Sequence, residues 1–175
     1  MPEFGFWKAA ARNPDRLAVA EVGGRTLKAG ELAAEANRLT HALRKLGLRP
    51  GDAVATCLPN GVEMIEAYLA AFQGGFYLVP INHHLVASEI AYILSDCEAK
   101  AFLGHEHFAE ACRAAAEEAG VPASGRLSVG KIAGFTPLAD AIAGCSSELP
   151  ENRTAGQVMN YTSGTTGRPK GVRRT

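Results

Sequence analysis

Short apolar runs alternate with longer amphipathic segments along most of this 175-residue chain. The apolar run 53–58, for example, precedes a segment in which Val62, Ile65, Leu69 and Phe72 recur at helical spacing. Strands that alternate with helices favour βαβ units, whose strands form a parallel sheet covered by helices on both faces. The sequence therefore predicts an α/β fold built on a mostly parallel sheet.

Apolar spacing and turn residues place the individual elements. Helices are expected within 1–16 and over 29–46, 61–73, 88–94, 108–119 and 136–143. Strands are expected over 17–22, 25–27, 53–58, 76–79, 100–103, 127–129 and 158–161, and a polar surface connection over 144–155. Two helix starts are inferred from polar residues. Asn60 with Glu63 has the spacing of a capping box, and Thr136 with Pro137 fits an N-cap followed by the first helical residue.

A stretch rich in glycine and hydroxyl side chains follows the last expected strand. Glycine lets the backbone approach a ligand closely, so that successive N–H groups can converge on anionic oxygens. Hydroxyl groups add donors, and Lys170 adds a positive charge. Because ligands gather at the carboxyl ends of parallel strands, we expect the loop to lie there. The pattern predicts a polyphosphate-binding loop made by Thr162, Ser163, Gly164, Thr165, Thr166, Gly167 and Lys170.

The spacing within this stretch distinguishes between kinds of phosphate loop. In the ATPase loop the lysine follows glycine and precedes Ser or Thr, whereas Lys170 lies between Pro169 and Gly171. Residues 161–172 instead resemble the signature of the AMP-forming adenylating enzymes, close to Y-T-S-G-[ST]-T-G-x-P-K-G-V, and match it at every fixed position. That family contains acyl-CoA synthetases, aryl-CoA ligases, luciferases and peptide-synthetase adenylation domains. A solvated Ser/Gly linker is the alternative, and the fixed Pro-Lys-Gly-Val spacing disfavours it.

The resemblance continues upstream in the same order as in the family. The segments 31–39, 51–60, 74–82 and 89–96 are similar to family motifs that form helices, strands and turns. Ala29 departs from the pattern, because an aromatic residue is usual there. The resemblance therefore covers nearly the whole chain, and its upstream part supports the fold more than the chemistry.

The resemblance implies a reaction for the parent enzyme. A carboxylic acid, which we expect to be a fatty acid, would react with ATP to give an acyl-adenylate, and CoA would then take the acyl group. ATP, Mg²⁺ and CoA are the implied cofactors and co-substrates. Lys170 and Thr165 are the implied catalytic residues, since the loop would hold the leaving phosphates. The alternatives are an aryl-acid CoA ligase, another adenylating enzyme, or a non-catalytic fragment that binds a nucleotide or a protein.

The resemblance also implies a domain organisation. Residues 1–175 are expected to be a partial N-terminal AMP-binding domain that ends just after the phosphate loop. We expect this piece to be inactive by itself, because the family's other substrate-binding segments follow the loop. We also expect it to form homo-oligomers through an open sheet edge or apolar surface.

Composition excludes several classes of partner and site. Eighteen basic and eighteen acidic residues give no electrostatic reason to expect nucleic acid. Four cysteines without a C-x-x-C pair suggest reduced thiols and a cytoplasmic protein. No apolar run is long enough for a membrane span, although the resemblance leaves room for a peripheral membrane contact in the parent. His83-His84 and His105-Glu106-His107 lack the i,i+4 spacing of helical metal ligands, so no metal site is expected.

Overall fold

The computed structural model describes residues 5–162 and 170–172. Its centre is a six-stranded sheet in which every neighbouring pair of strands is parallel, in the order β7-β6-β5-β3-β4-β8. The strands are β3 (Ala53–Cys57), β4 (Tyr77–Pro80), β5 (Ala99–His105), β6 (Arg126–Val129), β7 (Thr136–Pro137) and β8 (Gln157–Val158). The predicted α/β fold with a parallel sheet is therefore confirmed.

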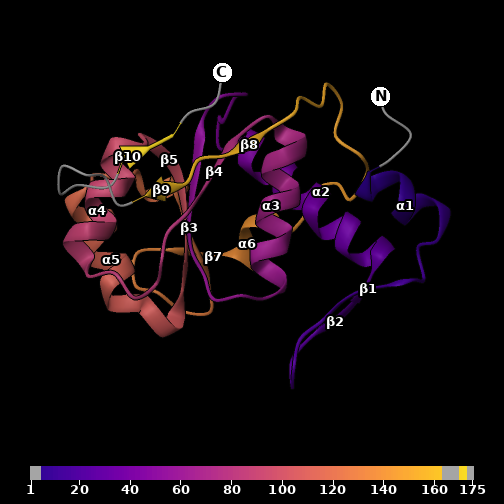
Figure 1. Ribbon diagram of the computed structural model, residues 1–175, viewed down its shortest axis with the longest axis horizontal. Coiled ribbons are helices and arrows are strands. Elements are labelled where there is room, and N and C mark those ends of the chain that lie inside the picture. Colours follow the sequence, from indigo (N-terminus) through magenta and orange to yellow (C-terminus); the bar gives the residue numbers. More distant parts are fainter. Residues whose placement is uncertain (1–4, 163–169, 173–175) are drawn as a thin grey trace.

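Helices cover both faces of this sheet (Figure 1). One face carries α2 (Ala29–Lys45), α3 (Val62–Gly74) and the short α6 (Leu138–Ile142). The other face carries α4 (Ala87–Asp96) and α5 (Ala109–Glu118), which pack against each other. The helix α1 (Phe6–Arg12) packs on α2, outside the layered core. Two 3₁₀ turns, η1 (Glu106–Phe108) and η2 (Ala123–Gly125), lead into α5 and β6.

The central strand β3 contributes to both hydrophobic layers. All five of its residues are buried. Ala55 and Cys57 belong to the cluster under α4 and α5, whereas Val54 belongs to the cluster under α2 and α3. This division follows from the strand itself, because successive side chains point to opposite faces. A mainly apolar run in the sequence thus becomes a strand buried on both sides.

Two predicted helix starts are wrong. The N-cap of α3 is Gly61 rather than Asn60, and glycine has no side chain that could cap the helix. Thr136 and Pro137 form β7, which pairs with Leu127 and Ser128 of β6, so that α6 begins one residue later. Proline is tolerated there because β7 is an edge strand of the described sheet.

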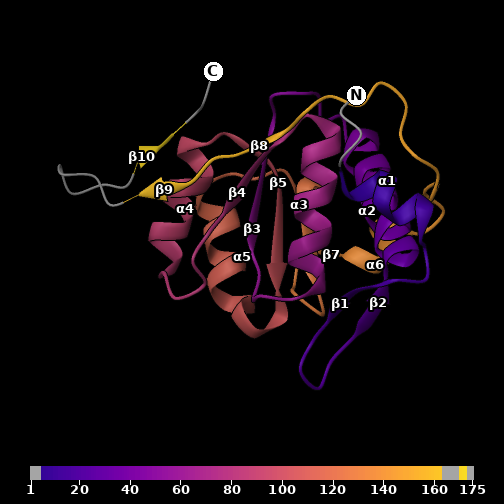
Figure 2. The same ribbon diagram turned by 45° about the vertical axis from the view of Figure 1, so that its right-hand side comes forward.

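The N-terminus of α3 is capped from a distant hairpin. The strands β1 (Leu17–Ala20) and β2 (Thr26–Lys28) form an antiparallel hairpin that projects from the layered core (Figure 2). Glu21 lies in this hairpin, and its Oε1 accepts a hydrogen bond of 2.6 Å from the backbone N–H of Val62. Its Oε2 accepts a second bond of 3.0 Å from the N–H of Arg25. These bonds, first the one from Val62, lower the pKa of Glu21 below its ordinary value.

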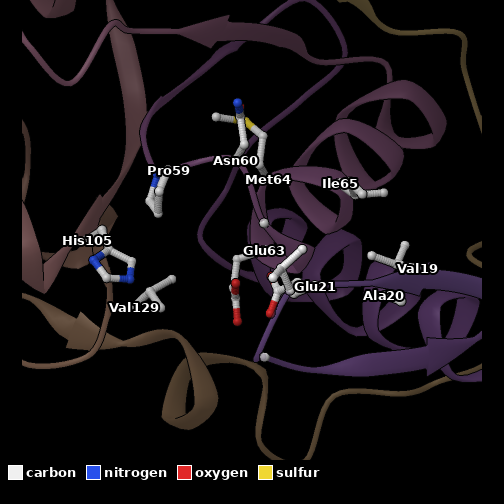
Figure 3. A pocket seen from close by; sticks show the side chains of 13 residues that line it. Val19, Ala20, Glu21, Pro59, Asn60, Glu63, Met64, Ile65, His105 and Val129 are labelled. Atoms are coloured by element: carbon white, nitrogen blue, oxygen red, sulfur yellow. The ribbon is translucent and has the colours of Figure 1, made fainter.

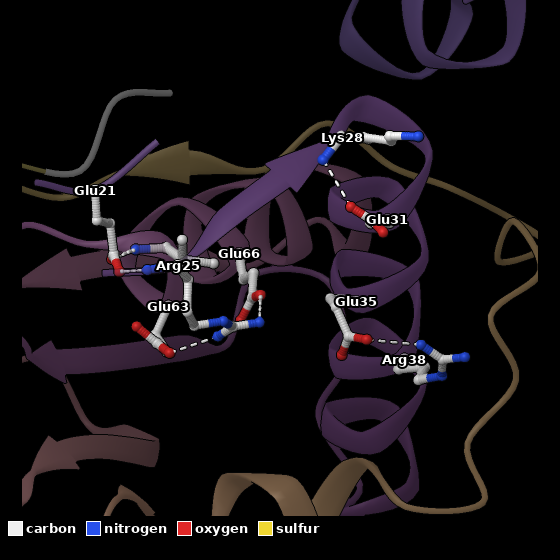
Figure 4. Close-up of polar contacts among 9 residues, drawn as sticks. Glu21, Arg25, Lys28, Glu31, Glu35, Arg38, Glu63 and Glu66 are labelled. Atoms are coloured by element: carbon white, nitrogen blue, oxygen red, sulfur yellow. Dashed lines mark hydrogen bonds and ion pairs between the residues drawn. The ribbon is translucent and has the colours of Figure 1, made fainter. Parts of the chain in front are cut away.

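Arg25 connects the same hairpin to the side of α3 (Figure 4). Its guanidinium lies 2.6 Å from Glu63 and 3.6 Å from Glu66. The Glu66 side chain is only 5% exposed, and its Oε1 accepts no hydrogen bond. Burial raises the pKa of Glu66 to about 7, against the opposing effect of Arg25. The fold therefore favours the neutral form of this carboxyl group.

The surface connection between α6 and β8 runs along α2, as the sequence predicts for residues 144–155. Asn37 donates a hydrogen bond of 2.8 Å to the carbonyl of Ser147, and Arg44 donates one of 2.6 Å to the carbonyl of Glu151. At its end the chain passes very close to α3. A Cβ added at Gly156 would lie 2.2 Å from the carbonyl oxygen of Ala71. Only glycine fits at this point, where the chain enters β8.

The raised pKa of Glu66 predicts a pH-dependent stability. Between its ordinary value of 4.5 and about 7, the folded protein holds the Glu66 proton more tightly than the unfolded chain does. The free energy of unfolding should therefore fall as the pH rises through this window. Glu66→Gln should remove the dependence, so that the variant gains on the order of 2 kcal/mol relative to the wild type between pH 5 and pH 8. Urea denaturation at several pH values measures this difference.

Glu110→Gln is the matched control, because it removes the same formal charge at an exposed position of α5. Parallel stability curves for wild type and Glu66→Gln across this pH range would show that Glu66 is not the titrating group.

Candidate functional site

The two ends of the glycine-rich loop form a small antiparallel hairpin. Its strands are β9 (Tyr161–Thr162) and β10 (Lys170–Gly171), and Thr162 lies directly opposite Lys170. Of the predicted site residues, the structure thus brings together the first and the last. The others, Ser163, Gly164, Thr165, Thr166 and Gly167, lie outside the described residues.

The pairing decides which side chains share a face of the hairpin. Residues directly opposite one another in an antiparallel pair project to the same side. Thr162 and Lys170 therefore lie together on one face, while Tyr161 and Gly171 occupy the other. Thr162 and Lys170 are both exposed. A hydroxyl group and an ammonium group on one exposed face can donate hydrogen bonds to a single anionic group.

The hairpin follows an interruption in the predicted last strand. β8 pairs with Tyr77 and Leu78 of β4, and the N–H of Met159 donates to the carbonyl of Leu78 at 2.8 Å. The chain then leaves the sheet, and Tyr161 donates a hydrogen bond of 2.5 Å to Oδ2 of Asp96, the last residue of α4. The expected strand 158–161 is therefore split between β8 and β9.

This position differs from the expected one at the carboxyl ends of the strands. β8 pairs with only the first half of β4, and α4 runs back from the end of β4 to the beginning of β5. The C-terminal end of α4, and the hairpin beside it, therefore lie nearer the amino ends of the strands (Figure 2). The departure arises because β8 forms only two pairs in the sheet before the chain turns onto α4.

The carboxyl ends of the strands form a different hollow, which the sequence analysis did not identify (Figure 3). It has a volume of about 800 Å³ and lies between the β1–β2 hairpin, the start of α3 and the ends of β5 and β6. Its titratable lining residues are Glu21, Glu63 and His105. Burial lowers the pKa of His105, and the neighbouring His107 lowers it further. The general preference of ligands for the carboxyl ends of parallel strands is the signal that could have found this hollow.

The charged side chains that line this hollow offer a polyphosphate little attraction. Glu21 and Glu63 both lie there, and although Arg25 pairs with Glu63, the lining that the structure describes contains no lysine or arginine. The lysine and hydroxyl donors lie instead on the β9–β10 hairpin. The side chains of the hairpin therefore suit a polyphosphate better than those of the hollow do.

Three further observations concern metals, membranes and cysteines. Among residues 5–162 and 170–172, no three His, Cys, Asp or Glu side chains are grouped so that they could hold a metal ion. Within the same residues, no helix has the length and hydrophobicity needed to span a bilayer. Cys57, Cys97 and Cys112 are buried free thiols, and Cys145 is a half-buried one.

Sequence comparisons identify relatives of the chain. It is 35% identical over 170 residues to feruloyl-CoA synthase of Amycolatopsis, covering 96% of this chain and 32% of the relative. It is 34% identical over 145 residues to the long-chain-fatty-acid–CoA ligase FadD13 of Mycobacterium tuberculosis, covering 81% of this chain and 28% of the relative. The chain thus spans about a third or less of the length of these curated relatives.

Comparison of structures supports the same fold. The crystal structure of the anthranilate CoA ligase AuaEII in complex with anthranoyl-AMP superimposes with a TM-score of 0.85 at 24% identity, covering 95% of this chain and 33% of that one. The family model described as AMP-binding enzyme matches residues 6–175. The signature at residues 161–172, the parallel sheet and these matches agree, and the chain belongs to the family of AMP-binding, adenylate-forming enzymes.

Proposed function

We propose that the enzyme containing this chain activates a carboxylic acid with ATP and transfers the acyl group to CoA. The carboxylate oxygen attacks the α-phosphorus of ATP, the bond to the β-phosphate breaks, and pyrophosphate leaves. The CoA thiol then displaces AMP from the acyl-adenylate. The observation that carries the proposal is the pairing of Thr162 with Lys170 at the base of a loop with the family signature. Residues 1–175 would form the first part of the N-terminal domain.

The loop residues would act on the leaving phosphates. Thr162, Ser163, Thr165 and Thr166 would donate hydroxyl hydrogen bonds, and Gly164 and Gly167 would let the backbone come close. Lys170 would neutralise negative charge as the α–β bond breaks. Mg²⁺ commonly binds through substrate phosphates and keeps several waters, and we propose that it enters the site together with the phosphates of ATP.

A fatty acid is the carboxylate that we propose as substrate. The similarity to FadD13, whose name specifies long-chain fatty acids, supports this choice. An aryl acid is the second candidate, favoured by the similar identity to feruloyl-CoA synthase. A panel of long-chain fatty acids and hydroxycinnamic acids in an ATP–pyrophosphate exchange assay separates the two. We also propose a cytoplasmic location, supported by the four free thiols, with any membrane contact of the enzyme being peripheral.

Substitutions in the loop test its role. In the complete enzyme, Lys170→Ala and Thr165→Ala should slow adenylate formation more than they weaken carboxylate binding, because both groups would contact the leaving phosphates. Loss of one charge-assisted contact costs about 1.5–3 kcal/mol, or roughly ten- to a hundredfold in rate. ATP–pyrophosphate exchange measures the step directly.

Two variants serve as controls for that experiment. Thr165→Ser keeps the hydroxyl group and should retain most of the activity. Lys8→Ala removes an exposed lysine on α1 and should leave exchange unchanged. Wild-type exchange rates in both loop variants would contradict the proposed role of the loop.

The 175-residue chain by itself is expected to form no acyl-adenylate. The reason is that the chain corresponds to only about a third of each relative, so most of what the relatives contain is absent from this piece. Pyrophosphate release, measured with the purified chain and with the complete enzyme under the same conditions, tests this expectation. Sustained carboxylate-dependent release from the purified chain, freed of host synthetases, would overturn it.

The isolated chain is also expected to self-associate through β8. This strand lies at an edge of the described sheet, and Phe72, Val158 and Val172 line a hollow of about 500 Å³ beside it. Exposed strand edges pair with other chains unless a charge opposes this. Sedimentation should therefore show dimers or larger assemblies, and Gln157→Lys should shift them toward monomers. A wild-type chain that sediments as a monomer at micromolar concentration would refute the expectation.

A further inference from the structure

The side of the phosphate-loop hairpin opposite Thr162 and Lys170 is held by one tyrosine. The Tyr161 hydroxyl donates to the Asp96 carboxylate at 2.5 Å, the length of a short charge-assisted hydrogen bond. Burial raises the pKa of Tyr161, and the bond to Asp96 raises it further, so the phenol keeps its proton and remains a donor at neutral pH. This contact links two residues that are 65 positions apart in the sequence.

The other strand of the hairpin packs against the same tyrosine. A Cβ added at Gly171 would lie 2.8 Å from Cζ and 2.9 Å from the hydroxyl oxygen of Tyr161. The ring therefore covers the backbone of Gly171, the residue directly after Lys170. Met159 lies at the same contact, since its sulfur would be 3.0 Å from that Cβ. Asp96, Tyr161 and Gly171 thus form a contact chain from α4 through β9 to β10, which we name the hairpin clamp.

The position of Asp96 in its helix indicates that its role is this contact. Asp96 is the last residue of α4, and the last turn of α4 contains no basic residue. A carboxylate at a helix C-terminus is disfavoured by the helix dipole. Within the described part of the chain, the Asp96 carboxylate is therefore stabilised by Tyr161 and not by its own helix.

We propose that Asp96 is a positioning residue for the phosphate loop, acting through the hairpin clamp to fix Thr162 and Lys170 on the opposite face of β9–β10. This inference rests on the proposed function of the loop. Asp96 does not touch the phosphates; it limits the movement of the hairpin whose other face binds them. Hence the clamp should affect the rate of adenylate formation and leave carboxylate binding unchanged.

The first test measures the clamp without any substrate. In the ligand-free complete enzyme, hydrogen exchange of the backbone amides of 170–172 is compared among Tyr161→Phe, Asp96→Ala and the double variant. Each single variant should exchange about tenfold faster, because one hydrogen bond to a charged group is lost. The double variant should match the singles, since both remove the same bond. Ser95→Ala, an exposed neighbour in the same turn of α4, is the matched control and should behave as the wild type.

The second test measures the consequence for the reaction. ATP–pyrophosphate exchange at saturating substrates should fall about tenfold in Tyr161→Phe and in Asp96→Ala, with an unchanged KM for the carboxylate. Asp96→Asn keeps an acceptor oxygen and should recover part of the rate. Unchanged hydrogen exchange of the amides of 170–172 in the single variants would overturn the clamp. So would a double variant whose increase in amide exchange rate is the product of the two single increases. A third outcome separates the two proposals. If the amides of 170–172 exchange hydrogen faster in the variants, but the wild-type enzyme shows no ATP–pyrophosphate exchange with any carboxylate, the clamp is supported and the proposed function is refuted.

Discussion

Burial of β3 on both of its faces is the constraint on which the rest of the fold depends. Side chains from this one strand enter both hydrophobic clusters, and its neighbours β4 and β5 pair with it in parallel. A parallel strand of this kind needs a helix layer on each side, because exposing either face would leave a row of apolar side chains in water. Each fully buried Val or Leu side chain contributes about 1.5–3 kcal/mol, so the two layers together outweigh any single surface contact.

Around that core, the peripheral segments are held mainly by polar contacts between distant parts of the chain. Glu21 joins the β1–β2 hairpin to the start of α3, and α2 binds the carbonyls of the connection that leads to β8. Tyr161 joins the loop hairpin to the end of α4. Such contacts are individually worth about 0.5–3 kcal/mol, which is enough to orient a segment and too little to create the fold. The core thus determines the architecture, and these bonds determine where the functional segments lie.

The distribution of charge distinguishes two places that could bind a ligand, the hollow at the carboxyl ends of the strands and the β9–β10 hairpin. Carboxylates line the hollow at the carboxyl ends of the strands, and one of them, Glu21, is already used to cap α3. The loop hairpin instead presents a lysine beside a hydroxyl group. These charges support the proposed anion site at the hairpin, although the general preference of parallel sheets would place a ligand at the carboxyl ends. The family signature and the electrostatics agree with each other on this point.

The local sequence pattern was sufficient to predict most of the secondary structure and the kind of ligand that the loop residues suit. The spacing of Leu32, Leu39 and Leu43 predicts α2, and the apolar run at 53–58 predicts β3, because side-chain period is a property of the backbone itself. The signature at 161–172 likewise shows its chemistry in its residues. Tertiary structure decided what those elements meet. Glu21, and not Asn60, accepts the hydrogen bond at the start of α3. Thr136 and Pro137 pair with β6 instead of starting a helix, and Tyr161 donates a hydrogen bond to Asp96. These partners lie from nine to 65 residues apart, and only the packing of the folded chain brings them within hydrogen-bonding distance.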